Sequence, residues 1–196
     1  VLLPRLRTGE LDFFVAEIST LNREPDLAVE PMSPHPLYFV GRPDHPLARR
    51  KDVKLSDTFA FPFAAPARIP PRLLAPMLSA KARSADGASL ARPFPAIECN
   101  AVSTVKRIVE GSDALTALTL SCMATELLDR RLVLIGSEPW LSVHYGVVSL
   151  KDRATSSAAA RLREFIVEAE AAVTLEESHL LERCGADGVG PHAAPR

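Results

Sequence analysis

The spacing of apolar residues along the chain indicates a protein that mixes helices and strands. Short runs that are apolar on both faces, such as residues 11–16 (LDFFVA) and 132–135 (LVLI), are typical of strands buried in a sheet. Apolar residues three or four positions apart predict helices over 102–110 and 156–173. Because helices and strands alternate along the chain, the pattern predicts an α/β fold with a parallel sheet.

Glycine and proline mark where the remaining elements begin and end. Gly9 directly follows the helix predicted over residues 1–7, where a left-handed cap is usual. Ser33, Pro34 and His35 are predicted to form a turn between two strands. The other predicted elements are strands at 27–32, 36–42, 61–65, 96–99, 114–118 and 143–150, helices at 71–80 and 121–128, and a helix that starts at 55–57.

Composition narrows the functional class. The chain has 196 residues, 47 % of them hydrophobic, which allows one ordinary domain or two small ones. Its net charge of -1 argues against a free-standing nucleic-acid binder. Three widely spaced cysteines favour a reducing, cytoplasmic location, and no apolar run is long enough to span a membrane. The first residue is Val1 rather than Met, so we expect the chain to be truncated at its N-terminus.

Motifs for metal binding and for catalysis are missing from the sequence. No pair of its five histidines has the spacing of metal ligands, and its cysteines form no C-x-x-C. There is no G-x-S-x-G, no H-E-x-x-H and no P-loop. We therefore expect no metal, no cofactor and no catalytic residue.

Several segments resemble the effector-binding region of LysR-type transcriptional regulators. Residues 6–15 (LRTGELDFFV) are similar to the family's "L..GELDlai" segment, and residues 36–48 (PLYFVGRPDHPLA) to its crossover strand and "HPLA" turn. Residues 55–59 (LSDTF) resemble the "vsLaDLa" element. Residues 103–118 (STVKRIVEGSDALTAL) stand in the place of "s...l..lVaaGlGiallP", and residues 132–135 in that of "G.L..L". The resemblance covers roughly residues 1–173.

The resemblance implies a fold and a function. The fold would be two Rossmann-like subdomains joined by two crossover strands, like type 2 periplasmic binding proteins, with the first subdomain incomplete. Subdomain I would comprise residues 1–41 and 143–180 and subdomain II residues 42–142, with 181–196 a disordered tail. A small effector would bind in the cleft between the subdomains. DNA would be bound by a helix-turn-helix upstream of this chain, and the protein would form a homodimer or homotetramer.

The predicted effector site lies where strands end and a helix begins. Asn100, Ser103 and Thr104 fall between the strand at 96–99 and the first turn of the next helix, where a carboxylate or polar group of an effector could bind. Simple capping of that helix by Asn100 is the alternative. Ala65 and Pro66, at the end of the preceding strand, would form the opposing wall.

Four further residues extend this predicted site. Arg68 could pair with an anionic effector, although a solvated loop arginine is the alternative. Glu17 follows a buried strand and, facing the cleft, would favour a cationic or hydroxyl-bearing effector. Thr116 and Thr119 flank a short strand and could bind a ligand or satisfy local backbone groups.

Two other functional classes stay open from the sequence. A two-lobed solute-binding protein of a transport system would share the fold, but three unpaired cysteines speak mildly against export. An α/β enzyme is disfavoured because no nucleophile and base, and no paired carboxylates, come together in the sequence.

Overall fold

The computed structural model describes residues 2–21, 24–66, 69–84, 87 and 91–184. It divides into two compact units. Unit 1 comprises Val1–His35 and Val143–Glu176, and unit 2 comprises Pro36–Ser142 and Glu177–Arg196. Two long strands, β2 (Leu27–Gly41) and β6 (Val133–Leu150), run from one unit into the other, as expected for crossover strands. The division into subdomains at the residues predicted from the sequence remains a prediction. Residues 185–196 of the predicted tail lie outside the described residues.

The strands form two sheets. A four-stranded sheet has the order β1-β6-β2-β5, and a separate pair joins β3 (Ala64–Pro66) to β4 (Ile97–Cys99). In the small sheet β3 and β4 pair in parallel, whereas in the larger sheet β1 (Phe13–Glu17) runs antiparallel to β6, and β5 (Thr116–Leu118) antiparallel to β2. The predicted parallel sheet is therefore wrong for the larger sheet. Along the described residues, a helix separates each strand from the next except between β1 and β2.

Both crossover strands are longer than predicted, because the expected breaks do not interrupt them. Pro31, Pro34 and Pro36 lie inside β2, and the predicted turn at residues 33–35 is wrong. Proline fixes φ near the extended range and biases the preceding residue to extended geometry, so a strand can pass through these positions. His35 is buried within the strand and pairs with Glu170 of the last helix. β6 likewise continues through residues 136–142, for which the sequence predicted no strand.

The helices match the predicted ones except at the C-terminal end. They are α1 (Leu2–Thr8), α2 (Leu55–Thr58), α3 (Pro71–Ala82), α5 (Val102–Glu110), a short 3-10 turn η1 (Ser121–Met123), α6 (Ala124–Leu128) and α7 (Ser157–Arg183). α7 extends ten residues past its predicted end at 173. The apolar spacing is interrupted there by Glu177, but this carboxylate is buried and accepts a hydrogen bond from the Ser121 amide at 2.9 Å.

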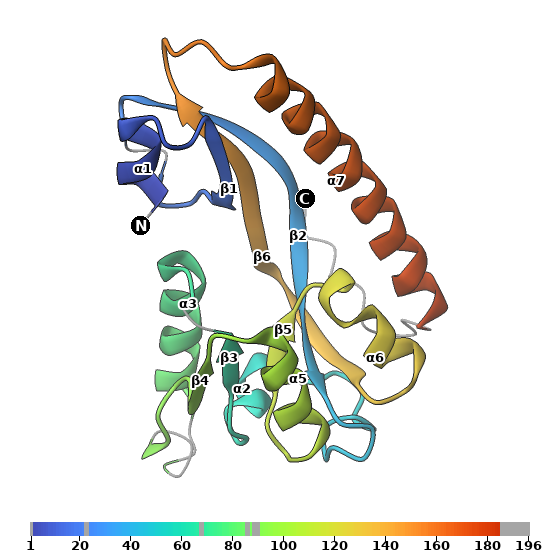
Figure 1. Cartoon of the computed structure of the whole chain (residues 1–196). Helices are drawn as coiled ribbons and strands as arrows, with labels where there is room; N and C mark the ends of the chain where they lie inside the picture. Colours follow the sequence, from blue (N-terminus) through green and yellow to red (C-terminus); the bar gives the residue numbers. More distant parts are fainter. Residues whose placement is uncertain (1, 22–23, 67–68, 85–86, 88–90, 185–196) are drawn as a thin grey trace, which may run out of the picture. The chain divides into compact units, whose positions relative to one another are not determined.

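Each unit has its own apolar cluster. In unit 1, Leu6 of α1 packs with Phe14, Ile18, Leu27 and Val148, and Figure 1 shows α1 beside β1. In unit 2, Tyr38 and Val40 of β2 pack with Val109 of α5, Met123 of η1 and Leu180 of α7. These clusters supply the hydrophobic stabilisation of each unit.

Two glycines allow close approaches in unit 1 that a side chain would block. Gly9 has φ +84°, which confirms the predicted left-handed cap of α1. The Arg153 guanidinium lies where a Cβ of Gly9 would be, and it donates to the Leu6 carbonyl at 3.2 Å. A Cβ on Gly146 of β6 would lie only 2.7 Å from the backbone oxygen of Glu30 in β2. The spacing of β6 and β2 therefore depends on the absence of a side chain at Gly146.

We expect Gly146→Ala to destabilise the protein by about 2 kcal/mol, because the carbonyl it meets belongs to a strand that cannot move without breaking its own packing. Gly111→Ala is the control, since a Cβ there would lie 3.5 Å from the nearest atom, the Arg107 oxygen. Denaturant unfolding of both variants checks this. Equal stability of the two variants would contradict the close packing at Gly146.

Candidate functional site

Three strand segments of unit 2 end at one edge. β3 pairs in parallel with β4, with Pro66 opposite Cys99. On its other side, Phe63 forms a parallel bridge with Leu115, and the Ala64 amide donates to the Leu115 carbonyl at 2.8 Å. The carboxyl ends of β3, β4 and β5 therefore meet at the same edge, which is where ligands bind in open α/β sheets.

Helix α5 begins at this edge and packs against β3, β4 and β5. Its N-cap is Ala101, whose side chain cannot cap the helix, and the Thr104 and Val105 amides both donate to the Ala101 carbonyl at 3.1 Å. The amides of Val102 and Ser103 point out of the first turn without an intrahelical acceptor. These donors, at the positive end of the helix dipole and with no acidic residue in the first turn, favour an anion.

The predicted polar residues surround this helix start. Asn100, Ser103 and Thr104 are all exposed, and none makes a side-chain hydrogen bond among the described residues. The alternative in which Asn100 caps this helix is therefore wrong, because the N-cap is the next residue, Ala101. The side-chain amide of Asn100 can thus bind another partner. Ala65 is wholly buried and Pro66 half-buried at the end of β3, where they form an apolar wall without polar side chains. Arg68 lies outside the described residues.

The two threonines of β5 have different surroundings. Thr116 is wholly buried on the face that it shares with Leu118, and its hydroxyl has no hydrogen-bond partner among the described residues. Thr119 follows the strand at its carboxyl end, is 8 % exposed, and shares a hydrogen bond of 3.0 Å with the Ser121 hydroxyl. Thr119 therefore lies at the edge with α5, whereas Thr116 faces the core of unit 2.

Glu17 ends β1 and belongs to unit 1. Its carboxylate accepts hydrogen bonds from the Ser19 hydroxyl at 2.6 Å and from the Ser19 amide at 3.2 Å. The side chain therefore closes the turn that follows the strand. A role in effector binding stays a prediction.

A buried ion pair that the sequence did not reveal holds the middle of α5. The Lys106 ammonium lies 2.7 Å from the Glu126 carboxylate of α6 and donates to the Cys122 carbonyl at 3.0 Å. Burial alone would raise the pKa of Glu126, but the hydrogen bond and the charge of Lys106, together with the charge of Arg131, hold that pKa below its usual range. The two partners lie on different helices, so no local pattern signals them.

A second buried polar residue, His45, orders the turn after β2. Its Nδ1 accepts from the Leu47 amide at 3.1 Å, so the hydrogen is on Nε2, which lies 3.3 Å from the Asp113 carbonyl. The ring also packs against Phe61, with centroids 4.4 Å apart. Burial lowers the pKa of His45, against the opposing effect of Asp113. His45 therefore stabilises this turn through its ring nitrogen as well as through its packing.

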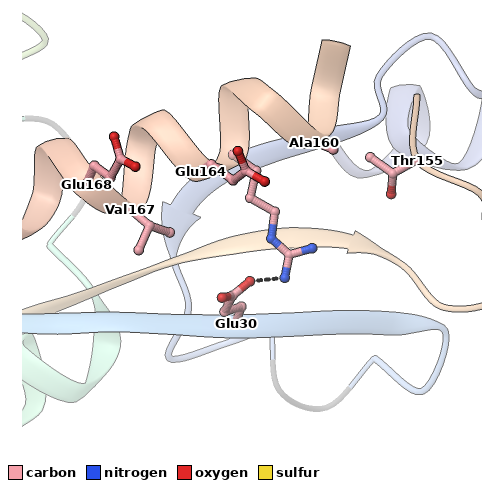
Figure 2. A pocket seen from close by; sticks show the side chains of 7 residues that line it. Glu30, Thr155, Ala160, Glu164, Val167 and Glu168 are labelled. Atoms are coloured by element: carbon pink, nitrogen blue, oxygen red, sulfur yellow. Dashed lines mark hydrogen bonds and ion pairs between the residues drawn. The ribbon is translucent and has the colours of Figure 1, made fainter. Parts of the chain in front are cut away.

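Unit 1 contains an open hollow of about 450 Å³ between α7 and β2, shown in Figure 2. It is lined by Glu30, Thr155, Ala160, Arg163, Glu164, Val167 and Glu168. The dashed line in Figure 2 marks the ion pair between Arg163 and Glu30, and a further ion pair of 2.6 Å joins Glu164 to Arg161. Two of its three carboxylates are thus already paired with arginines, and none of the predicted site residues lines it.

The described part of the chain contains neither a metal site nor a membrane span. No three histidine, cysteine or acidic side chains among its residues gather as metal ligands, and all three cysteines are free thiols. Within the same residues, no helix combines the length and the apolar character that crossing a membrane requires.

Comparison with known proteins shows the family. The sequence model described as "LysR substrate binding domain" matches residues 1–171. The chain belongs to this LysR family. A curated relative, the "SDS degradation transcriptional activation protein" of Pseudomonas sp. (strain ATCC 19151), is 33 % identical over 172 residues, which are 85 % of this chain and 53 % of the relative. The LysR chain thus spans about half the length of that relative.

Solved structures confirm the two-subdomain α/β fold of LysR regulatory domains. The regulatory domain of CcmR from Synechocystis PCC6803 matches with a TM-score of 0.64 and 16 % identity over 86 % of this chain and 78 % of that chain. OxyR of Corynebacterium glutamicum, as a C206 mutant, matches with a TM-score of 0.62 and 19 % identity over 96 % of this chain and 55 % of that chain. At these identities the likeness concerns the fold alone.

We expect Lys106→Met to lower the free energy of unfolding by about 1–3 kcal/mol, because it leaves the buried Glu126 carboxylate without its main partner. The double variant Lys106→Met with Glu126→Leu should recover part of the loss, because no charge then stays buried. Arg161→Ala, which removes an exposed pair, is the control and should cost under about 0.5 kcal/mol. Denaturant titration measures all three. A Lys106→Met variant as stable as the control would contradict the anchoring of α5.

Acid should destabilise the protein through His45. Its pKa is lowered in the folded state, so the unfolded chain binds the proton first as the pH falls below the usual histidine value of about 6.5. The stability that neutral His45 contributes is complete above that pH and is lost as the pH falls towards the folded-state pKa. Unfolding measured at about pH 7.5 and pH 5.5 should show a larger loss in the parent than in His45→Gln. An equal loss in both would rule out this contribution.

Proposed function

We propose that this LysR chain is the effector-sensing and oligomerising portion of a DNA-binding transcriptional regulator in the cytoplasm. A small molecule would bind the chain, and DNA would be bound by a helix-turn-helix in a part of the protein outside this sequence. The family model over residues 1–171 and the activator-type relative support this role. They do not favour a solute-binding protein of a transport system, and we assign the chain no catalytic role.

The start of α5 carries the proposal for the effector site. Asn100, Ser103 and Thr104 present an amide and two hydroxyls without partners among the described residues, beside the free first-turn amides. Ala65 and Pro66 would pack against the apolar part of the ligand, and Thr119 lies at the same edge. Arg68, Glu17 and Thr116 stay in the proposed site as predictions from the sequence.

The chemistry of this site favours an organic anion. A hydrogen bond to a charged group contributes about 1.5–3 kcal/mol, and the helix dipole adds about 0.3–1 kcal/mol. Three or four such donors around one sulfate or carboxylate would give micromolar affinity once the entropy of binding is subtracted. The relative's name refers to the degradation of SDS, an alkyl sulfate, so alkyl sulfates are the first class to test.

Binding becomes a signal only through a difference in affinity between two states. A ligand shifts a protein between two arrangements by no more than the ratio of its affinities for them. We propose that α5 contacts the effector more closely in one arrangement of the chain than in the other. The anchoring of α5 by Lys106 and Glu126 would make that helix move with α6 as one body.

Thermal unfolding with hexyl sulfate and hexanoate, both too short to act as strong detergents, tests the site. We expect each anion that binds to raise the melting temperature. Asn100→Ala and Thr104→Val should each weaken binding by about tenfold, because each removes one hydrogen bond to a charged group. Thr125→Val is the matched control, since Thr125 is exposed on α6 of the same unit.

Two outcomes would overturn parts of the proposal. If Asn100→Ala and Thr104→Val bind the anion as well as the parent, the start of α5 is not the site. If neither anion stabilises the parent but a cationic or neutral ligand does, the proposed effector class is wrong.

A further inference from the structure

The C-terminal end of α7 packs into unit 2, although the helix begins in unit 1. Leu180 is buried in the apolar cluster of unit 2, and Leu181 and Cys184 pack against the same cluster. We call residues 177–184 the α7 end, which lies beside α6 in Figure 1. Its position therefore depends on contacts within unit 2.

A buried carboxylate, that of Glu177, joins the α7 end to the start of η1. Glu177 is 7 % exposed and accepts a hydrogen bond of 2.9 Å from the backbone amide of Ser121. Ser121 is the first residue of η1, which continues into α6, so its amide has no acceptor within its own turn. Burial and the negative charge of Glu177 together raise the pKa of Tyr38, which shows that this charge acts inside unit 2. A side chain of α7 therefore caps η1.

Ser121 is bonded in turn to the edge at which the effector site is proposed. Its hydroxyl shares a hydrogen bond of 3.0 Å with the hydroxyl of Thr119, which follows β5 at its carboxyl end. Thr119 is buried, as Glu177 is, so both ends of this connection are largely shielded from water. A chain of polar groups thus leads from the edge through Ser121 to the α7 end.

An anion at the edge would select one direction of this chain. A threonine hydroxyl has a single proton, so Thr119 can donate either to Ser121 or to a ligand, but not to both. When Thr119 donates to an anion, its bond with Ser121 requires the Ser121 hydroxyl to donate. Ser121 is then held at both its hydroxyl and its amide, and hydrogen bonds aligned in a chain strengthen one another. The ion pair of Lys106 with Glu126 joins α5 to α6, the helix into which η1 continues.

From this arrangement we propose that Glu177 couples the effector site to the α7 end, so that an anion bound at the edge holds this end of the helix in place. The inference rests on the proposed effector site and adds a means of regulating it. Coupling is reciprocal, so a change that loosens the α7 end weakens the binding of the anion by the same factor. Glu177 acts through Ser121 and Thr119, which makes it a positioning residue.

The direct effect of the Glu177 charge has the opposite sign. Removing a nearby negative charge would strengthen the binding of an anion by Coulomb's law. The coupling predicts weaker binding instead, because the Ser121 amide loses its acceptor and the α7 end is loosened. The sign of the change in affinity therefore separates the two effects.

Calorimetric titration of the chain with hexyl sulfate tests the coupling. We expect Glu177→Leu to raise the dissociation constant at least about fivefold, the lower end of the usual range for coupled sites. Glu177→Gln should stay within about twofold of the parent, because its side-chain oxygen still accepts from the Ser121 amide. Glu182→Leu is the matched control, since it removes a carboxylate from an exposed position of the α7 end, and it should bind as the parent does.

Two native thiols report whether the α7 end is in place. Burial raises the pKa of Cys184 in the α7 end, so loosening this end should speed its reaction with a thiol reagent, whereas Cys122 of η1 is exposed. We expect saturating hexyl sulfate to slow the labelling of Cys184 at least about threefold in the parent and to leave that of Cys122 unchanged. Ser121→Ala keeps the amide but lacks the hydroxyl, so the anion should no longer slow the labelling of Cys184. Because Ser121 is exposed, this variant keeps the test open even where Glu177→Leu fails to fold.

The outcomes distinguish the coupling from the effector site itself. Binding by Glu177→Leu that is as tight as in the parent, or tighter, overturns the coupling and leaves the effector site standing. Labelling of Cys184 that hexyl sulfate leaves unchanged in the parent, or slows equally in Ser121→Ala, also overturns the coupling alone. If hexyl sulfate fails to bind the parent, or binds Asn100→Ala as tightly, the effector site is wrong and the coupling falls with it.

Discussion

The candidate site depends on the parallel pairing of β3 with its two neighbours. β3 bonds to β4 on one side and, through Phe63 and Ala64, to Leu115 on the other. Parallel pairing brings three carboxyl ends to one edge, and it requires a crossover helix between strands. α5 is such a connection, so the pairing that builds the edge also delivers the helix amides to it. Antiparallel pairing would have sent alternate strand ends, and the start of α5, in opposite directions.

A buried ion pair holds α5 against α6, beyond the first turn of α5. The pair of Lys106 and Glu126 and the nearby Arg131 keep the carboxylate ionised although Glu126 is only 8 % exposed. Such a pair contributes little net stability compared with an apolar substitute, but separating its members is costly. Its effect is therefore geometric: the pair fixes the middle of α5 to α6 and leaves the first turn of α5 exposed to solvent.

The sequence predicted those parts of the structure that local pattern determines. The ends of α5 and the left-handed cap at Gly9 follow from spacing and from glycine, and the resemblance led to the correct family. Prediction from the sequence failed where contacts between residues far apart in the chain determine the structure. β2 continues through Pro34, and the neighbouring His35 pairs with Glu170 of α7, which is far away in the chain. α7 continues past residue 173, where the buried Glu177 carboxylate accepts a hydrogen bond from the distant Ser121 amide.

Prediction of the site had the same limit. The sequence alone places three residues at one helix start, because Asn100, Ser103 and Thr104 are near neighbours in the chain. It also indicates that strands end near Pro66 and Thr119. The burial of these side chains could not be inferred. Thr116 faces the core because it lies opposite Val40 of β2, and β2 comes far earlier in the chain. The pair of Lys106 and Glu126 was missed for the same reason.

The prolines of β2 have a consequence for how the protein avoids self-association through its backbone. β5 pairs with β2 only at Tyr38–Val40, so among the described strands the earlier part of β2 has no neighbour on that side. An open strand edge is a template on which other chains can add and aggregate. Because proline has no N–H group, Pro31 and Pro34 each remove one donor from β2, and α7 is tied to the strand by Arg163 and Glu170. A strand with missing donors is a poorer template for the addition of another chain.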